Sequence, residues 1–372
     1  MKRDWVARRP FDGVPSRWAC IMAGGLGRRF WPLSRRTRPK HLIPVVGADT
    51  LLRQTGQRLA DVVGWDHLMV VTNGEQASAV RTELPELPTG HVLAEPVGRN
   101  TAACVGLALR WLQLRREEGG TVGFFPSDHV VEDLDGFRLC LDRAWALAES
   151  GRVVAFGIVP TSPETGYGYM RVGAALHDAA QPRAFEVKSF HEKPDLAHAR
   201  QWAVSGEHFW NSGMFVAKVD VLWAELARLL PATAEVLRRL GSELGDDDLA
   251  AHREVYSGLA DVSVDHGIME HSHLMAMVES TFRWDDVGSW EAASRYWPLS
   301  AGDNRLLGGD VTLVDCSGCR VRSEDLLVAL VGMQDVIVVQ SGDAILVCPR
   351  DRAQDVKALV ENLETGARKR YL

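Results

Sequence analysis

Short apolar segments that alternate with amphipathic helical patterns dominate the first part of the chain. Five of them are read as buried strands, at 18–22, 67–72, 91–94, 121–126 and 152–158. Helical spacing of apolar residues lies between them, at 51–62, 76–83, 101–116 and 137–148. Strands that alternate with helices at this spacing are typical of a doubly wound α/β sheet with parallel strands. Ligands of such sheets bind beyond the carboxyl ends of the strands.

The pattern changes further along the chain. Short alternating stretches from 165 to 215 predict a mixed-sheet insertion, and helices return at 219–240 and 247–256. Beyond residue 310, five short apolar segments follow one another and end in a helix at 352–363. They predict a small β-rich domain, built like a few coils of a solenoid. Because no sequence repeat is visible there, a full β-helix is not expected. We therefore expect a flexible extension over 1–17, a first domain over 18–300 and a β-rich domain over 301–372.

The charge of the chain is unevenly distributed. It has 42 Lys and Arg residues against 49 Asp and Glu residues, a formal net charge of −7. From Gly13 to Ala48 there are seven basic residues and no acidic one, which leaves 35 basic residues for the rest of the chain. A positive segment on an otherwise acidic chain predicts a specific anion site. It argues against general binding to nucleic acid or to an anionic membrane.

The positive segment contains a glycine-rich loop, AGGLGRR at 23–29, directly after the first strand. Glycines let the backbone approach an anion and present its N–H groups to phosphate oxygens. The planar guanidinium of Arg29 adds several N–H donors for phosphate oxygens. The loop lacks the third glycine of the dinucleotide fingerprint, which argues against a nicotinamide-dependent oxidoreductase. It also lacks the Gly-Lys-Ser/Thr ending of a Walker loop.

This loop, continued by FWPLS and RPK, resembles the signature of the nucleoside-diphosphate-sugar pyrophosphorylases. Further motifs follow in the order of that family and match its guanylyltransferase branch: EPVGRNTA at 95–102, FPSDH at 125–129, FGIVP at 156–160, ETGYGY at 164–169, EKP at 192–194, WNSGM at 210–214, SVD at 263–265 and WDDVG at 284–288. The resemblance runs with these motifs from about residue 18 to residue 290, and more loosely from there to the C-terminus. It implies a Rossmann-like doubly wound mixed sheet of the nucleotide-diphospho-sugar transferase type, with a small C-terminal β-rich domain.

The resemblance also implies a reaction, which is transfer of GMP from GTP to α-D-mannose 1-phosphate with release of pyrophosphate. Both the nucleophile and the leaving group are ionised phosphates, so catalysis needs positioning and charge neutralisation more than a base. The implied cofactor is Mg²⁺, with Mn²⁺ as a substitute, held by Asp128 and Asp286. Asp285 stays open as an alternative to its neighbour. The implied catalytic residues are Arg29 at the α-phosphate, Lys40 at the β/γ end, Asp128, and Lys193 at the phosphate of the sugar.

The binding residues come from the same motifs. For the nucleotide they are Ala23, Gly24, Gly25, Gly27, Arg28, Glu95, Pro96, Arg99, Asn100, Thr101 and Ser127. For the sugar phosphate they are Glu164, Gly166, Tyr167, Gly168, Glu192, Lys193, Asn211, Ser212, Gly213 and Asp265. The residue that recognises guanine is not identified by the sequence. His129 is either a positioning group or a structural histidine.

Two other functions remain as alternatives. One is nucleotidyl transfer to another hexose or heptose 1-phosphate, and the other is a non-catalytic regulatory paralogue that binds a nucleotide sugar. The expected partners are GTP, mannose 1-phosphate, GDP-mannose and pyrophosphate, and the C-terminal strands offer an interface for a homodimer. With no apolar run near the ~20 residues of a membrane span and no signal-peptide core, we expect a cytoplasmic protein. Since the chain stops at Leu372, without room for the isomerase domain of fused relatives, we expect a single activity.

Overall fold

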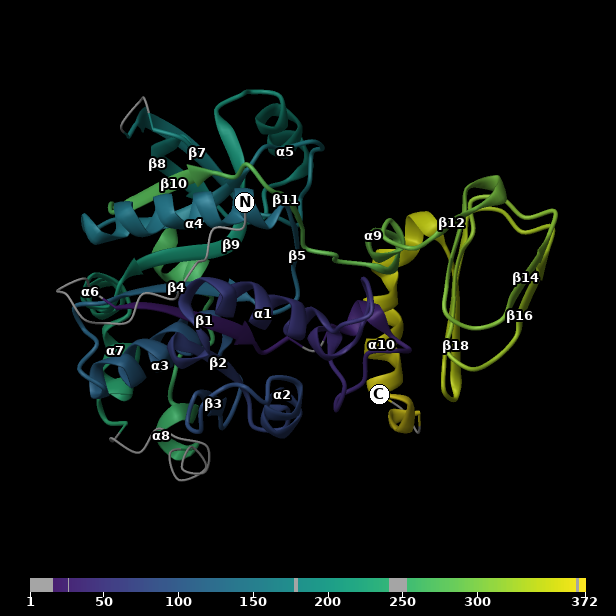
Figure 1. Ribbon diagram of the computed structural model, residues 1–372, viewed down its shortest axis with the longest axis horizontal. Helices are drawn as coiled ribbons and strands as arrows, with labels where there is room; N and C mark the ends of the chain where they lie inside the picture. Colours follow the sequence, from purple (N-terminus) through teal and green to yellow (C-terminus); the bar gives the residue numbers. More distant parts are fainter. Residues whose placement is uncertain (1–15, 26, 177–179, 241–252, 366–367) are drawn as a thin grey trace, which may run out of the picture. The chain divides into compact units, whose positions relative to one another are not determined.

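The computed structural model describes residues 16–25, 27–176, 180–240, 253–365 and 368–372. They form two compact units (Figure 1). Unit 1 comprises the described residues of Met1–Gly24, Thr55–Ser127 and Val131–Asp285, and unit 2 comprises those of Gly25–Gln54, Asp128–Val130 and Asp286–Leu372. The chain therefore passes several times from one unit to the other. Within the described ranges, no helix combines the length and the apolar character that a membrane crossing requires.

Unit 1 is built on a nine-stranded sheet in the order β3-β2-β1-β4-β9-β6-β10-β8-β7. Its strands are β1 (Arg17–Ala23), β2 (Leu68–Asn73), β3 (Val92–Glu95), β4 (Thr121–Pro126), β6 (Val153–Ile158), β7 (Tyr169–Ala175), β8 (Ala184–His191), β9 (His208–Lys218) and β10 (Met275–Glu279). Strands β3, β2, β1 and β4 are parallel, as are β6 and β10. Strand β9 lies antiparallel between β4 and β6. The doubly wound mixed sheet is thus confirmed. The common direction expected for the first five strands is confirmed as well, because β4 and β6 are both antiparallel to β9 and therefore run the same way. Strand β9 comes from the insertion and lies between them.

Helices cover the sheet of unit 1, with α3 and α4 on opposite sides of it in Figure 1. The helices are α1 (Leu51–Val63), α2 (Ala77–Glu83), α3 (Asn100–Leu114), α4 (Leu134–Glu149), α5 (Leu196–Ala203), α6 (Val219–Leu229), α7 (Pro231–Arg238) and α8 (Arg253–Ser257). The single helix expected over 219–240 is wrong, because Pro231 cannot continue a helix and instead begins α7. Of the helix expected at 247–256, residues 247–252 lie outside the described residues.

Unit 2 carries a small solenoid of short strands. Its strands are β12 (Leu299–Ser300), β13 (Asn304–Leu307), β14 (Val311–Val314), β15 (Arg320–Ser323), β16 (Val328–Val331), β17 (Val336–Ser341) and β18 (Ala344–Pro349). Strands β13, β15 and β17 form one parallel ladder, and β14 and β16 form another. The small β-rich domain built like a few coils of a solenoid is thus confirmed. Equivalent positions on successive coils share residue types, since Val311, Leu313 and Val314 of β14 pair in register with Val328, Leu330 and Val331 of β16. The expected absence of a sequence repeat is therefore wrong.

Two helices complete unit 2, which are α9 (Trp290–Ser294) and α10 (Val356–Glu364). Both bury apolar side chains in one core together with Phe30 and Trp31 from the basic segment. Trp290 packs edge-on against Phe30, with ring centroids 4.9 Å apart, and its indole N–H donates to the carbonyl of Trp31. Apolar residues that lie among the arginines of this segment, including Leu33 and Ile43, are therefore buried in the core of unit 2.

Candidate active site

A cavity of about 430 Å³ in unit 2 collects residues that are far apart in the sequence. It is lined by Gly27, Arg28, Arg29, Phe30, Lys40, Asp128, His129, Asp286, Gly288 and Lys357. Six of the site residues predicted from the sequence therefore meet here. Four cationic side chains face two carboxylates, so the cavity attracts anions while it keeps acidic groups for a cation.

Lys40 joins the segments that build this cavity. Its side chain is buried, and its ammonium donates to Asp128 Oδ2 and to the carbonyl of Asp128, both at 2.9 Å. It also donates to the carbonyl of Asp286 at 2.6 Å. An ammonium has three N–H groups, so these bonds use all of them. Lys40 thus holds both carboxylate-bearing segments in place.

Gly27 permits the close approach that Lys40 requires. Its φ of +61° lies in the left-handed region. A Cβ atom at this position would lie 2.2 Å from Cβ of Lys40 and 2.9 Å from its backbone nitrogen. Any other residue at position 27 would push the Arg28–Phe30 turn away from Lys40.

Asp128 is ionised at every pH near neutrality. Its partial burial disfavours the charge, but the Lys40 ammonium beside it and the nearby ring of His129 outweigh that effect. Together they lower its pKa from 3.8 to about 2. His41, next in the chain, is buried, and burial lowers its pKa to about 4, so it adds no charge at pH 7.

Asp286 sits in a tight turn before α9. A Cβ at Gly288 would lie 2.8 Å from Asp286 Oδ2, so the glycine leaves room for the carboxylate. Between them, Val287 is fully buried and has a φ of +46°, which is unfavourable for a β-branched residue. Of the two adjacent aspartates, Asp286 lines the cavity, while Asp285 ends β11 (Arg283–Asp285), which pairs with β5 (Val130–Glu132).

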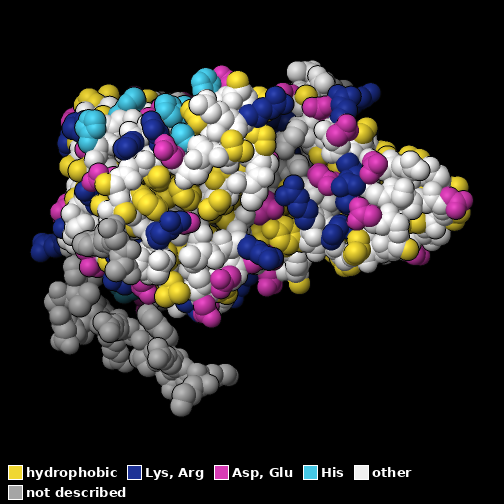
Figure 2. Space-filling model, turned by 90° about the horizontal axis from the view of Figure 1, so that it is seen from above, with side chains coloured by type: hydrophobic (Ala, Val, Ile, Leu, Met, Phe, Trp, Pro, Cys, Tyr) yellow, Lys and Arg dark blue, Asp and Glu magenta, His cyan; other side chains and the backbone are white. Residues whose placement is uncertain are grey.

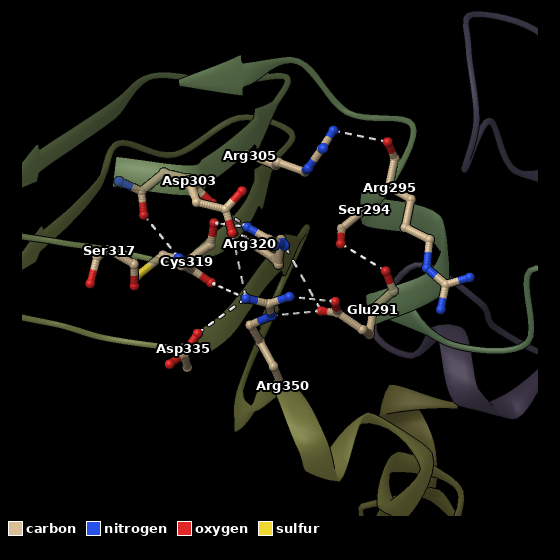
Figure 3. A network of polar contacts seen from close by, with 12 residues as sticks. Glu291, Ser294, Arg295, Asp303, Arg305, Ser317, Cys319, Arg320, Asp335 and Arg350 are labelled. Atoms are coloured by element: carbon tan, nitrogen blue, oxygen red, sulfur yellow. Dashed lines mark hydrogen bonds and ion pairs between the residues drawn. The ribbon is translucent and has the colours of Figure 1, made fainter. Parts of the chain in front are cut away.

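An ion network anchors the helix that follows this turn (Figure 3). The guanidinium of Arg350 forms two hydrogen bonds with the carboxylate of Glu291 in α9, at 2.7 and 3.0 Å. Arg320 from β15 is buried and lies 3.9 Å from the same carboxylate. Arg320 forms a second ion pair with Asp303, and Arg350 forms one with Asp335. The solenoid thereby holds the start of α9, and with it the Asp286 turn, in a fixed position.

The two arginines of the glycine-rich loop differ in their partners. Arg28 pairs with Glu364 of α10 at 2.8 Å and lies 4.0 Å from Glu361. Arg29 is exposed and forms no ion pair with the described residues. Lys357, also from α10, lines the same cavity. Lys357 lies outside the sequence motifs. Only the packing of α10 against the loop shows that it lines the cavity.

A second cluster lies in unit 1, where strands β7, β8 and β9 run side by side. Asn211 on β9 donates to Asp265 Oδ1 at 2.9 Å, and its own Oδ1 accepts from the N–H of Gly213 at 3.1 Å. Burial and the neighbouring charge of Glu192 raise the pKa of Asp265 to about 6. Lys193 pairs with Glu192.

Glycine again makes room in this cluster. A Cβ at Gly168 would lie 2.6 Å from Glu192 Oε2, and the Gly168 carbonyl accepts from the N–H of Asn211 at 2.8 Å. The ring of Tyr167 packs on Trp210 and Trp284. Ser212 is buried and binds the N–H of Met214, whereas Glu164 and Gly166 lie on an exposed loop. The structure therefore brings Gly168, Glu192, Lys193, Asn211 and Asp265 together and leaves Glu164 and Gly166 at the periphery.

Glu95, at the end of β3, is a buried carboxylate. Its Oε1 accepts from the hydroxyl of Tyr256 at 2.7 Å. Burial raises its pKa to about 7, although the hydrogen bond from Tyr256 opposes the shift. Its Oε2 lies 3.9 Å from where a Cβ of Gly24 would be, so the exposed Gly24 leaves the approach to this carboxylate open. Tyr256 lies outside every motif of the sequence.

The other residues expected around a nucleotide base are placed as follows. Thr101 Oγ1 accepts from the N–H of Val264, which ties the start of α3 to the segment of Asp265. Arg99 donates to the carbonyl of Ser257, Asn100 Oδ1 accepts from the N–H of Thr101, and Pro96 is half-buried. Ala23 and Ser127 are buried at the ends of β1 and β4, and Gly25 is exposed.

The charges of the surface fit a local anion site. On the face shown in Figure 2, Lys and Arg side chains are interspersed with Asp and Glu side chains. The described residues of that face therefore present no continuous cationic field. No three His, Cys, Asp or Glu side chains of the described part of the chain form a metal-binding group. The two carboxylates Asp128 and Asp286 line the same cavity as the cationic side chains, and carboxylate oxygens are suitable ligands for a divalent metal ion.

Comparisons with known proteins agree on one family. A family model described as nucleotidyl transferase matches residues 18–300, and a model of the mannose-P isomerase/GMP-like β-helix domain matches residues 309–363. The chain is 36% identical to the mannose-1-phosphate guanylyltransferase of Klebsiella pneumoniae over 358 residues, covering 94% of this chain and 74% of that protein. It is 37% identical to the alginate biosynthesis protein AlgA of Pseudomonas aeruginosa, with 94% and 72% covered.

A solved structure is similar over nearly the whole chain. It is described as a mannose-1-phosphate geranyltransferase from Thermus thermophilus and superposes with a TM-score of 0.83 at 34% sequence identity. The match covers 94% of this chain and 100% of that one. The similarity thus includes the β-rich segment as well as the large sheet.

Proposed function

Because this chain belongs to the nucleotidyl transferase family, among the mannose-1-phosphate guanylyltransferases, we propose that it transfers GMP from GTP to α-D-mannose 1-phosphate. The products are GDP-mannose and pyrophosphate. The observation that carries the proposal is the cavity of unit 2, where Arg28, Arg29 and Lys40 meet Asp128 and Asp286. Such a set of charges suits a polyphosphate with a divalent cation.

The proposed step is an in-line displacement at the α-phosphorus. An oxygen of the sugar phosphate forms a bond to this phosphorus, and the bond from the phosphorus to the oxygen of the β-phosphate breaks. The electron pair leaves with pyrophosphate, and no proton has to move. Negative charge collects on the oxygens of the α-phosphate, where the exposed guanidinium of Arg29 is placed to neutralise it.

We propose Asp128 and Asp286 as the residues that hold a divalent metal, with Mg²⁺ as the natural ion and Mn²⁺ as a substitute. When bound, the metal would supply Lewis-acid charge neutralisation to the phosphates. The chain keeps both groups ready for this role, since Lys40 orders the two segments and keeps Asp128 ionised. In the proposal Lys40 faces the β/γ end of the triphosphate from this fixed position.

Base recognition is assigned to the loop after β3. Guanine offers N–H donors on its Watson–Crick edge, and a carboxylate accepts two of them. Glu95 has that capacity, with Tyr256 fixing one of its oxygens. In the proposal Pro96, Arg99, Asn100 and Thr101 shape the loop around it. Ala23, Gly24, Gly25, Gly27 and Ser127 supply backbone contacts for the nucleotide, and Arg28 adds charge.

The cluster of unit 1 is assigned to the sugar phosphate. Lys193 offers a compact ammonium to the phosphate, while Glu192, Asn211 and Asp265 offer acceptors and donors to the hydroxyls. The remaining proposed contacts come from Glu164, Gly166, Tyr167, Gly168, Ser212 and Gly213. For domain organisation we propose 18–300 as the catalytic domain and 301–372 as the β-rich domain. The proposal is supported by two separate family models, which match 18–300 and 309–363.

The proposed function is tested by pyrophosphate release from every pairing of GTP, UTP, dTTP and ATP with mannose, glucose and heptose 1-phosphates. We expect GTP with mannose 1-phosphate to give the highest kcat/KM. Equal or better turnover with another pair would reassign the substrates. Tight binding of GDP-mannose without turnover of any pair would favour the regulatory alternative.

The pKa of Asp265 predicts how sugar binding depends on pH. Because this carboxyl has a pKa of about 6, it accepts hydrogen bonds from sugar hydroxyls above pH 6 and loses that capacity below it. We expect the KM for mannose 1-phosphate to rise about tenfold between pH 7 and pH 5. In Asp265→Asn we expect the KM to depend less on pH, because only the phosphate of the substrate itself still titrates in this range. Identical pH profiles of parent and variant would remove Asp265 from the sugar site.

The same carboxyl predicts the pH dependence of stability. Its folded pKa is raised above the unfolded value of 3.8, so its ionisation costs stability as pH rises from about 4 to about 6. The Tm of Asp265→Asn, measured relative to the parent, should therefore rise over this interval and stay constant above it.

Lys193→Ala tests the phosphate contact of the sugar. We expect the KM for mannose 1-phosphate to rise at least ~10-fold with little change in the KM for GTP, because a charge-assisted hydrogen bond is lost. Lys188→Ala serves as the control, since Lys188 is an exposed lysine on β8. Unchanged kinetics of Lys193→Ala would exclude this residue from the site.

A further inference from the structure

The C-terminal helix α10 places a lysine in the cavity of unit 2. Lys357 is the second residue of this helix, and it lines the cavity together with Arg28, Arg29 and Lys40. It lies more than 300 residues from the glycine-rich loop in the sequence. None of the motifs described above includes it.

The position of Lys357 is determined by packing rather than by a mobile tail. Val356, Val360 and Leu363 of α10 are buried in the core that also holds Phe30 and Trp290. The same helix contacts the Arg28–Phe30 turn. On a helix anchored in this way, residue 357 is held at the cavity wall beside the arginines of the loop.

Lys357 has donors available, which Lys40 does not. All three N–H groups of Lys40 are used on Asp128 and Asp286. The ammonium of Lys357 lies 3.8 Å from Glu361 Oε1, an ion-pair distance that is too long for a hydrogen bond. Its side chain is 56% exposed. Of the two lysines in the cavity, Lys357 is therefore the one able to donate hydrogen bonds to an incoming anion.

Glu361 links Lys357 to the loop. It lies 3.8 Å from the ammonium of Lys357 and 4.0 Å from the guanidinium of Arg28, so one carboxylate is shared by two cations. Both contacts are long and partly exposed, hence weak. A phosphate that enters the cavity therefore competes easily with Glu361 for Lys357.

We infer that Lys357 binds the β- and γ-phosphates of GTP and, after the reaction, the pyrophosphate. The inference rests on the proposed function for the identity of the nucleotide. An ammonium is a compact charge that suits non-bridging phosphate oxygens. No bond to Lys357 forms or breaks, and its contribution is to neutralise the charge that departs with the leaving group. The β-rich domain thereby takes part in catalysis through its terminal helix.

The test compares the affinities of GTP and GMP by isothermal titration calorimetry on the full chain with Mg²⁺. GMP has the base, the ribose and the α-phosphate but lacks the β- and γ-phosphates. For Lys357→Ala we expect the Kd of GTP to rise about tenfold, the loss typical of one charge-assisted hydrogen bond, with less than about a twofold change for GMP. Lys357→Arg keeps the charge, and we expect its Kd for GTP to stay within about threefold of the parent.

A matched control removes another cation near the same helix. Arg352 is exposed, pairs with Asp355 just before α10 and does not line the cavity. Arg352→Ala should leave both affinities unchanged. The inference is overturned if Lys357→Ala binds GTP as well as the parent does, if GTP and GMP weaken equally, or if Arg352→Ala weakens GTP binding to the same extent.

Glu361→Gln gives an independent readout, because it removes the competing carboxylate. We expect this variant to bind GTP about two- to threefold more tightly than the parent. Weaker GTP binding by Glu361→Gln would contradict the competition between Glu361 and the phosphates for Lys357.

The affinity measurements do not depend on turnover, so they test the inference separately from the proposed function. If the parent makes no GDP-mannose but binds GTP more tightly than GMP, and Lys357→Ala removes that preference, the proposed function is wrong and the inference holds. If the parent makes GDP-mannose and Lys357→Ala changes neither turnover nor the two affinities, the proposed function holds and the inference is wrong.

Discussion

Replacing Asp286 by asparagine is expected to reduce kcat by at least about 1,000-fold at saturating Mg²⁺, which corresponds to about 4 kcal/mol of lost transition-state stabilisation. Asparagine keeps the shape of the side chain in the tight turn but removes the charge that the proposed metal site needs. The variant should fold normally, because its buried neighbours Val287 and Trp290 are unaffected. Initial rates of pyrophosphate release, with Tm as the folding check, measure the effect.

Asp285→Asn is the matched control for this prediction. Asp285 carries the same group one residue earlier but ends β11, and only Asp286 lines the cavity. We expect Asp285→Asn to keep its kcat within about threefold of the parent. If Asp286→Asn remained active while Asp285→Asn did not, the metal carboxylate would have to be assigned to Asp285.

Lys40→Met should be the second most damaging change. Methionine keeps an unbranched side chain beside the ring of Phe30 but leaves Asp128 without its ammonium partner and the carbonyl of Asp286 without its donor. We expect kcat to fall at least ~100-fold, because the two carboxylate segments are no longer held together. We also expect a loss of about 2 kcal/mol in the free energy of unfolding, moderated because the Asp128 side chain is still 35% exposed.

The pH dependence of that loss has a definite sign. The pKa of Asp128 is lowered from 3.8 to about 2 in the folded protein, so the pair with Lys40 stabilises the fold above pH 4 and loses its effect as pH falls toward 2. Urea unfolding of parent and Lys40→Met should therefore differ most above pH 4, and the difference should shrink as the pH falls from 4 toward 2.

Lys40→Arg tests whether the positive charge at position 40 is sufficient or whether the directions of its three hydrogen bonds also matter. A guanidinium carries the same charge but cannot direct three donors to the three acceptors that converge on the ammonium of Lys40. We expect this variant to be nearly as impaired in kcat as Lys40→Met while it recovers part of the stability. Parental activity of either variant would show that Lys40 does not organise the cavity.

The candidate site was predictable from the sequence wherever a residue acts within a motif. The glycine-rich loop and the segment of Asp128 each follow a strand of the large sheet, and strand ends of such sheets are where ligands bind. Asp286 was predicted from the WDDVG motif alone. The structure brings Arg29, Lys40, Asp128 and Asp286 to one cavity, as the resemblance implied. Their assigned roles in catalysis stay predictions.

Residues that act from outside the motifs could not be predicted. Tyr256 reaches Glu95 from a short helix, and Lys357 reaches the cavity from the last helix of the chain. Neither has a local signature, because their positions depend on how distant helices pack. The coils of the solenoid were predicted from the spacing of their strands, but their repeat was not recognised. It is short, since Val311, Leu313 and Val314 match Val328, Leu330 and Val331 within a strand of only four residues.

The sequence by itself determined the alternation of buried strands and helices, the concentration of positive charge between Gly13 and Ala48, and the family. Periodicity, charge and motifs are local properties, so they can be read along the chain. Only the tertiary structure decided that β9 runs antiparallel within the sheet, that Lys40 directs its three donors to Asp128 and Asp286, and that α10 supplies Lys357. Each of these depends on contacts between segments far apart in sequence, whose energies no local pattern records.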